Sequence, residues 1–219
     1  MDPSFVTVKG ACLLDGMSAA PTRRERKRQD VSDRLYQAAF TLFVHQGFDA
    51  TTMDEIAESA DVARATVFNH YPQKAAFLDE WGRRRRARVT ATLAEHHAED
   101  LPAAEQLRHY LSEMATLNIT ARRETAALMP ASMRFAAPLS GPALEIDLAE
   151  VVRRGQDRQE LRADTDAVLV GQLLAAGYFA TVLRWIGEEP APFALDQRLD
   201  ELAGLILGGL LPPATTASS

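Results

Sequence analysis

The sequence predicts an all-α fold, with an N-terminal unit of three helices followed by a larger helical region. Apolar residues recur at the three- and four-residue spacing of amphipathic helices, and no segment alternates as a strand would. Glycine and proline stand where these periodic segments stop, as they do at helix ends. The chain has 219 residues, of which 47% are apolar, and this is enough to build a buried core.

The first predicted helix follows a basic cluster, RRERKR, at residues 23–28. Asp30 is a plausible N-cap, and apolar residues then recur from Leu35 to Phe43 before Gly47 ends the helix. We expect residues 1–22 to form a flexible tail, with Met17 as an alternative start. The cluster itself is either a solvated charge run or an arm that adds general affinity for a polyanion.

Two short helices are predicted next. Thr52 stands three residues before Glu55, which is the spacing of a capping box. Residues 61–62 leave room for little more than a tight turn before Arg64 opens the following helix, and Pro72 ends it. Two short helices joined by a tight turn and braced by a longer one are typical of a helix-turn-helix unit, whose second helix enters the major groove.

The second short helix, RATVFNH, carries side chains suited to reading base edges. If Val67 and Phe68 face inward, Arg64 is left to contact guanine, Asn69 to contact adenine or phosphate, and Ala65 to admit a thymine methyl group. Threonines at a helix N-terminus and polar groups beyond the reading helix would contact phosphates. The predicted DNA contacts are Arg28, Thr51, Thr52, Arg64, Ala65, Thr66, Asn69, His70, Tyr71 and Lys74. The alternative is a plain helical subdomain with His70 and Tyr71 in its core.

The charge distribution is compatible with this interpretation, although the net charge is −6. From residue 21 to residue 90 there are 13 Lys and Arg against 10 Asp and Glu, whereas from 101 to 219 there are 10 against 15. The basic and acidic parts suggest two separate tasks in one chain.

The segment TTMDEIAESADVARATVFNHYPQKAAFL resembles the N-terminal signature of the TetR family of transcriptional regulators, over about residues 31–80. Thr51 and Thr52 match the opening threonines of that signature, and residues 56–60 match its I-A-x-x-A core. The positions that follow in register are Val62, Thr66, Val67, Phe68, Tyr71, Lys74 and Leu78.

Three positions depart from that signature. Asp61 replaces the usual turn glycine, which is tolerable because Asp adopts left-handed geometry. Ala63 replaces the usual Ser or Thr cap of the reading helix. Phe68 stands where a tyrosine often contacts phosphate, so that hydroxyl contact is not expected here.

The resemblance implies a larger helical C-terminal domain that dimerises and senses a small molecule. The remaining sequence is compatible, because it predicts helices over residues 73–97, 102–122, 124–137, 143–159, 165–186 and 193–210. We expect Pro130 to kink its helix and residues 137–143 to form a loop. The predicted domains are residues 23–72 for DNA binding and 73–211 for the linking helix, effector binding and dimerisation, with a flexible tail over 212–219.

Residues 168–186 and 195–210 are too apolar on all sides to be ordinary surface helices of a monomer. A two-fold bundle of both helices would bury the excess, so we expect a homodimer that binds palindromic double-stranded DNA. Leu183 and Leu205 are the tentative interface positions. Gly171 and Gly177 either permit close contact of helices across the dimer or simply accommodate packing.

Flexible apolar side chains with a few polar groups suit a largely apolar effector. The candidates are Tyr110, Met114, Leu117, Asn118, Met129, Met133, Phe135 and Tyr178, and the alternative for each is a plain core position. The arginine run at 83–86 sweeps more than one helical turn, so we expect a solvated or carboxylate-paired surface rather than a DNA contact.

No catalytic, metal or cofactor site is predicted. His96 and His97 are adjacent on a helix and point apart, so with Glu95 and His109 they do not form the i, i+4 pair that zinc sites use. No nucleophile elbow or phosphate-binding glycine loop is present in the sequence. The single cysteine, Cys12, and the lack of a leader or a charge-free apolar span favour a cytoplasmic protein with no membrane partner.

Two functions remain open from the sequence. The first is a dimeric DNA-binding regulator, most often a repressor, that a small apolar effector releases from its operator. The second is a helical small-molecule-binding or catalytic protein whose three-helix unit makes protein contacts.

Overall fold

The computed structural model describes residues 22–135 and 144–210, and every regular element within them is a helix. The predicted tails, Cys12, Met17 and the predicted loop at 137–143 lie outside these residues. The helices are α1 (Arg23–Gln46), α2 (Met53–Ser59), α3 (Arg64–His70), α4 (Ala75–Glu95), α5 (Ala103–Thr120), α6 (Arg122–Phe135), α7 (Leu144–Asp157), α8 (Ala167–Ile186) and α9 (Leu195–Gly208), with a 3₁₀ turn at Ala98–Asp100.

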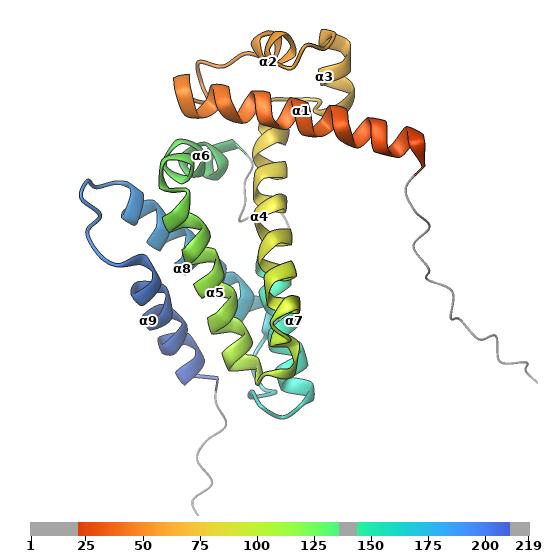
Figure 1. The fold of residues 1–219 in the computed structure, drawn as a ribbon. Helices are drawn as coiled ribbons and strands as arrows, with labels where there is room; N and C mark the ends of the chain where they lie inside the picture. Colours follow the sequence, from red (N-terminus) through yellow and green to blue (C-terminus); the bar gives the residue numbers. More distant parts are fainter. Residues whose placement is uncertain (1–21, 136–143, 211–219) are drawn as a thin grey trace, which may run out of the picture.

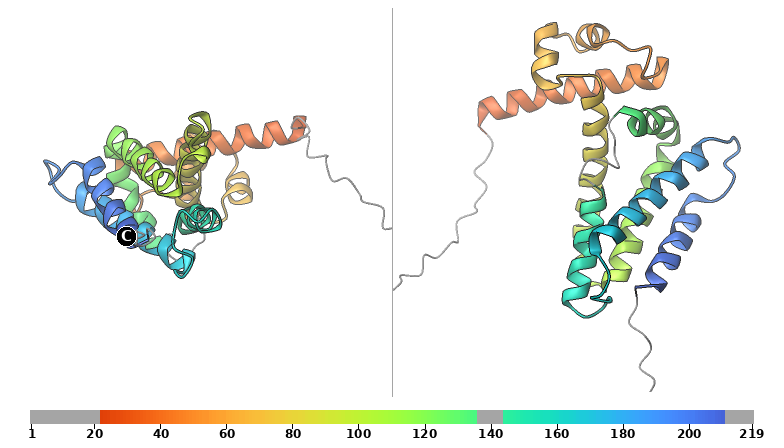
Figure 2. Two further views of the ribbon diagram at one scale, coloured as in Figure 1. Left: turned by 90° about the horizontal axis from the view of Figure 1, so that it is seen from below. Right: turned by 180° about the vertical axis from the view of Figure 1, so that it is seen from behind.

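The helices form two packed parts (Figure 1). Helices α1, α2 and α3 cover one end of the molecule, and α4 runs from this unit along a bundle that contains α5, α7, α8 and α9. Helix α6 lies between the two parts and contacts both α1 and α4. The view from behind shows α8 crossing the bundle with α9 beside it (Figure 2).

Helix α1 begins earlier than predicted, and Asp30 is not its N-cap. The cap is Thr22, whose hydroxyl accepts the backbone N–H of Glu25 at 3.2 Å while the Glu25 carboxylate accepts the Thr22 N–H at 2.7 Å. This capping box satisfies two backbone donors that the helix leaves unpaired. Residues 23–28 are therefore the first turns of α1, and their side chains are exposed.

The apolar faces of all these helices join in one core. Its largest fully buried side chains in the N-terminal unit and in α4 are Leu35, Phe43, Ile56, Phe77 and Leu78. In the bundle they are Leu107, Leu111, Leu128, Met129, Leu148, Leu174 and Tyr178. Burying side chains of this size stabilises a fold by about 1.5–3 kcal/mol each relative to exposure.

The two glycines of α8 allow close packing inside the chain. A Cβ at Gly171 would lie 2.3 Å from the carbonyl oxygen of Glu145 on α7, and one at Gly177 would lie 2.7 Å from the Leu202 side chain on α9. Their role is thus contact with neighbouring helices of the same chain. Among the described residues α8 also has the length and hydropathy of a membrane span, and 44% of that window is buried within the chain.

Candidate nucleic-acid interface

The turn between α2 and α3 has the geometry that a helix-turn-helix unit needs. Asp61 adopts φ 51°, as expected for the residue that replaces a turn glycine. Arg34 of α1 holds this turn, because its guanidinium donates to the carbonyl oxygens of Ala60 and, at 3.0 Å, Asp61. The role of Arg34 was not predicted, because an exposed arginine on an amphipathic helix carries no sequence signal of a backbone partner.

The capping box of α2 is confirmed. The Thr52 hydroxyl accepts the Glu55 N–H at 3.2 Å, and the Glu55 carboxylate accepts the Thr52 N–H at 2.7 Å. Thr51 was expected to contact phosphate, but it is buried and its hydroxyl donates to the carbonyl oxygen of Gly47 at 2.9 Å. Thr51 therefore closes the loop between α1 and α2, and only the exposed Thr52 of the pair faces solvent.

The orientation of α3 differs from the prediction at one residue. Val67 is fully buried, whereas Phe68 is 39% exposed. Successive helical residues lie about 100° apart, so a helix of seven residues that points Val67 into the core turns Phe68 out of it. Ala63 makes no side-chain cap, in agreement with its departure from the family signature.

The outward side of α3 carries most of the predicted base contacts. Arg64, Ala65 and Asn69 are exposed, and Thr66 is partly exposed. Arg64 lies over the Phe68 ring, 5.5 Å from its centroid, and its Nε is 3.0 Å from an Asp54 oxygen on α2. The guanidinium is thus held at the exposed edge between the two short helices.

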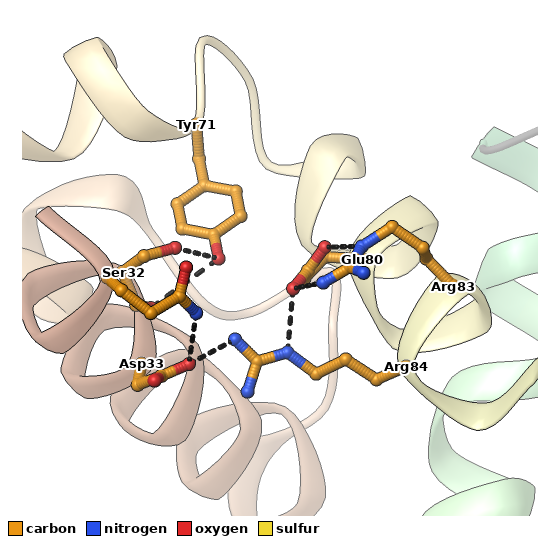
Figure 3. Close-up of polar contacts among 7 residues, drawn as sticks. Ser32, Asp33, Tyr71, Glu80, Arg83 and Arg84 are labelled. Carbon is orange, nitrogen blue, oxygen red and sulfur yellow. Dashed lines mark hydrogen bonds and ion pairs between the residues drawn. The ribbon is translucent and has the colours of Figure 1, made fainter. Parts of the chain in front are cut away.

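Two of the polar groups beyond α3 have structural partners instead. The Tyr71 ring is buried and stacks on Phe77 with 3.9 Å between centroids, and its hydroxyl lies 3.0 Å from Ser32 Oγ (Figure 3). Lys74 Nζ donates to backbone carbonyl oxygens of Phe48 and Thr51 at 2.6 and 2.8 Å. The described partners of Tyr71 and Lys74, both predicted to contact DNA, thus lie within the chain: Tyr71 belongs to the core and Lys74 anchors a loop.

His70 and the basic turns of α1 lie near each other. Burial lowers the pKa of His70 below its ordinary value of 6.5, and the charge of Arg28 lowers it further. Both effects favour the neutral form of His70, which retains one N–H donor. The exposed cations of the same turns are Arg23, Arg24, Arg26, Lys27 and Arg28. Together they form a positive surface at the N-terminal end of α1, close to the end of α3.

The arginine run of α4 joins the N-terminal unit to the bundle (Figure 3). Arg83 and Arg84 both bind the Glu80 carboxylate, and Arg84 also reaches Asp33 of α1 at 2.5 Å. These ion pairs, together with that of Arg86 and Asp147, agree with the predicted carboxylate pairing.

Arg85 differs from the other arginines of the run, because it is buried. It donates to Asn118 Oδ1 at 2.8 Å, in the interior of the bundle. Asn118 also accepts from Thr125 at 3.2 Å and donates to the Tyr178 hydroxyl at 2.9 Å. We call Arg85, Asn118, Thr125 and Tyr178 the buried polar cluster.

The residues predicted to line a ligand pocket divide, within the described part of the chain, between two cavities and the core. Leu117 lines a cleft between α1, α4, α5 and α6, whereas Tyr110 lines a cavity between α4, α5 and α7. Asn118 and Tyr178 belong to the buried polar cluster. Phe135 lies at the end of α6 against Phe48 of the N-terminal unit, with 5.2 Å between ring centroids. The remaining candidates pack in or against the core: Met114, Met129 and Met133.

The described chain thus combines an exposed helix-turn-helix unit with a helical bundle that contains cavities. Residues 35–81 match the family model described as bacterial regulatory proteins, tetR family. The regulator TcmR of Streptomyces glaucescens is 39% identical over 54 residues, which are 25% of this chain and 24% of TcmR. IcaR of Staphylococcus aureus strain Newman, a negative regulator of the biofilm operon icaADBC, is 32% identical over 50 residues, 23% of this chain and 27% of IcaR. The matched segment thus spans about a quarter of the length of these relatives.

Solved structures extend the likeness to the bundle. FadR of Thermus thermophilus, a TetR-family repressor solved in complex with lauroyl-CoA, is 28% identical with a TM-score of 0.71, covering 86% of this chain and 99% of that one. FadR of Bacillus halodurans, at 17% identity and a TM-score of 0.60 over 82% and 95% of the chains, shares the fold. Residues 35–81 thus match the TetR family model, and the whole chain shares the fold of TetR-family regulators. The alternative of a catalytic or purely ligand-binding protein is not favoured.

Proposed function

We propose that the protein is a cytoplasmic, ligand-responsive repressor that binds DNA as a dimer and leaves it when a small effector binds. The main support is the exposed side of α3, where Arg64, Ala65 and Asn69 lie beside the basic turns of α1. Residues 23–72 would form the DNA-binding domain, and residues 73–211 would bind the effector and the second subunit. The proposal includes no catalytic step and no cofactor.

Base reading would rest on Arg64 and Asn69. A bidentate contact to one base contributes about 1–3 kcal/mol of discrimination. Arg64→Ala and Asn69→Ala should weaken operator binding by about that amount while leaving non-specific binding nearly unchanged. Gln37→Ala is the matched control, since Gln37 is exposed on α1. Equal losses on operator and random DNA would contradict base reading.

The operator can be sought in DNA that flanks the protein's own coding region, by nuclease protection and mobility shift. We expect an inverted repeat, with half-sites about 34 Å or a multiple of it apart. Removing the basic turns up to Arg28 should weaken binding to all sequences and flatten its salt dependence. Absence of any protected site, with no binding to non-specific DNA either, would refute the proposed function.

Dimerisation would use the exposed apolar stripe of α8. Leu169, Leu173, Ala176 and Ala180 recur at helical spacing on its exposed side, and Leu205 of α9 is 81% exposed. A monomer rarely leaves such a stripe uncovered. The tentative choice of Leu183 is less suitable, because that side chain packs against the core of its own chain.

The dimer is tested by sedimentation of Leu173→Asp and Leu205→Asp. Both variants should dissociate, because a carboxylate in the interface would lose its water without gaining a partner. Ile119→Asp is the matched control, because Ile119 is 45% exposed on α5, outside the stripe. A wild-type monomer at micromolar concentration that still binds one palindromic site tightly would contradict the dimeric mechanism.

The effector would be a largely apolar molecule. The support is the likeness to FadR of Thermus thermophilus, whose structure holds lauroyl-CoA. We expect acyl-CoA to lower operator affinity, because an effector that binds the released conformation better shifts the population towards it. Mobility shift with and without lauroyl-CoA tests this expectation, with CoA alone as the control.

A further inference from the structure

The cleft between α1, α4, α5 and α6 has a volume of about 310 Å³ and is rich in arginine. Arg84, Arg85 and Arg88 line it from α4, and its acidic residues are Glu113 and Glu124. Two other cavities of similar size are lined by more acidic than basic residues. The one between α4, α5 and α7 has three carboxylates and one arginine, and so does the one between α5 and α9.

One of the two acids in the cleft already has a close partner. Glu124 Oε1 accepts the indole N–H of Trp81 at 2.7 Å and lies 3.7 Å from Arg85. Arg88 is exposed and has no ion-pair partner among the described residues. Because Glu80 and Asp33 pair with Arg84, the positive charge of the cleft that has no ion-pair partner among the described residues is that of Arg88.

Arg85 is a second cation in the wall of the cleft. A guanidinium has five N–H donors in a planar fork suited to carboxylate and phosphate. The described contacts of Arg85 are a hydrogen bond to Asn118, a neutral amide, and the 3.7 Å approach to Glu124. The carboxylate nearest to Arg85 is thus 3.7 Å away, and an anion bound closer to the guanidinium would make a stronger, charge-assisted contact.

The remaining walls of the cleft are aromatic and apolar. The guanidinium of Arg84 lies over the Tyr36 ring at 4.0 Å, and that of Arg85 lies over the Trp81 ring at 4.9 Å. Val89 and Leu117 complete the apolar lining. Such a surface accepts an apolar body next to the charged head of a ligand.

We propose that this cleft binds an organic anion, a carboxylate or phosphate carried on an apolar body, with Arg85 and Arg88 holding the charged head. The inference rests on the proposed function in that this anion would be the effector. It adds to that proposal a site, the residues that recognise the ligand, and the sign of the ligand's charge.

The position of the cleft also gives the ligand a route to the N-terminal unit. Tyr36 belongs to α1, and Arg84 binds Asp33 of the same helix. An anion in the cleft competes with Asp33 for the Arg84 guanidinium. Occupancy would therefore weaken the ion pair that holds α1 on α4, and this is the differential contact that a population shift requires.

Direct binding can be followed by tryptophan fluorescence. The chain has two tryptophans, so Trp185→Phe leaves Trp81, in the wall of the cleft, as the single reporter. The probes are laurate, lauroyl-CoA, CoA alone and dodecanol, each below its micellar concentration. We expect laurate or lauroyl-CoA to change Trp81 emission. Dodecanol, which has the tail but no charge, should bind at least on the order of tenfold more weakly, as should CoA without a tail.

Two variants in the same background test the site. Arg88→Glu should weaken binding of the anionic probe on the order of tenfold, because it replaces a charge-assisted contact with repulsion. Leu117→Phe, which adds no second tryptophan, should weaken it by filling the cleft. Arg123→Glu is the matched control, since Arg123 is also exposed but does not line the cleft, and it should bind as the wild type does. Unchanged DNA binding of the free variants checks their folding.

Each outcome has a definite meaning. Binding of laurate points to a carboxylate head and binding of lauroyl-CoA alone points to phosphates, and in either case the loss in Arg88→Glu supports the site. If lauroyl-CoA releases DNA equally from Arg88→Glu and the wild type, the effector proposal stands and the cleft is refuted. If no anionic probe binds a protein that still binds its operator, the inference fails while the DNA-binding function stands.

Discussion

The N-terminal unit and the helical bundle are stabilised in different ways. In the unit, buried side chains are apolar except Thr51, and its polar bonds lie at the edges, at helix caps and at the α2–α3 turn. The bundle instead buries Arg85, Gln106, Asn118, Thr125 and Ser132. Removing one member of a buried polar network leaves its partners unsatisfied, whereas an apolar core loses only packing. The stability of the bundle should therefore be more sensitive than that of the unit to the loss of single polar groups in its interior.

The largest change in the free energy of unfolding is expected for a substitution in the buried polar cluster. Asn118→Ala removes the acceptor of Arg85 and Thr125 and the donor to Tyr178. Leaving a buried charge without its partner should lower the free energy of unfolding by about 3–5 kcal/mol. Urea denaturation at fixed protein concentration measures this. Thr116→Ala, at an exposed position of α5, should stay within about 0.5 kcal/mol of the wild type. A loss below about 1 kcal/mol for Asn118→Ala would mean that the cluster is not a strong determinant of stability.

A smaller effect is expected at the turn of the N-terminal unit. Arg34→Ala frees the carbonyl oxygens of Ala60 and Asp61, which then bind water instead of a charged donor. We expect a loss of about 1–2 kcal/mol in unfolding free energy, together with weaker operator binding because α3 is less firmly held. Gln37→Ala again serves as the control. If Arg34→Ala binds the operator normally, the turn is rigid without this brace.

The cap of α2 should contribute less. Thr52→Ala removes the oxygen that accepts the Glu55 N–H, and loss of such a cap costs about 1 kcal/mol. Thr52→Ser keeps the oxygen and should retain most of the stability. Thermal unfolding of the two variants side by side distinguishes the hydroxyl from the methyl group, and equal losses would exclude the cap as the cause.

The smallest change in the free energy of unfolding is expected for a substitution of Asp147, which lies half-buried at the edge of the bundle. Burial raises the pKa of Asp147 above its ordinary value of 3.8, although Arg86 and Tyr110 oppose this rise. Its ionised form is thus less favoured in the folded than in the unfolded chain, so this carboxylate lowers stability once the pH exceeds the folded pKa. Asp147→Asn should therefore stabilise the protein at pH 7 by a few tenths of a kcal/mol, given its solvent exposure.

That gain should shrink as the pH falls towards 3.8, where the carboxyl group becomes protonated in both states. Urea unfolding of Asp147→Asn and the wild type between pH 7 and pH 4 gives the difference. A gain that grows at low pH would reverse the sign of the argument.

Much of the fold followed from local signals in the sequence. The capping box of Thr52 and Glu55, the left-handed Asp61 and the stop before Pro72 each depend on residues within a few positions of one another. The predicted start of α1 was wrong, although the sequence contains a capping-box signal there as well, formed by Thr22 and Glu25. The basic residues after Thr22 were interpreted as a flexible arm, and the capping box then showed that they are helical.

The site was less predictable, because its contacts are distant in the sequence. Thr51, Tyr71 and Lys74 are polar and lie beside the reading helix, yet their partners on α1 and its loop turn them inward. The predicted inward orientation of Phe68 was wrong for a geometric reason. The rotation of the short helix α3 about its axis is set by a single buried residue, Val67. The buried position of Arg85 could not be inferred from a run of four similar arginines.

The contacts between the N-terminal unit and the bundle are of three kinds: a continuous helix, ion pairs and an aromatic contact. Besides the continuous helix α4, they include Arg84 with Asp33, Arg134 with Asp49, and Phe135 against Phe48. The match to the family model ends at residue 81, inside α4 and close to this boundary. A boundary of this kind lets the two parts diverge at different rates, because new bundle residues need to preserve only a small number of partners. A lineage can in this way acquire a response to a new chemical signal while it keeps the same set of regulated genes.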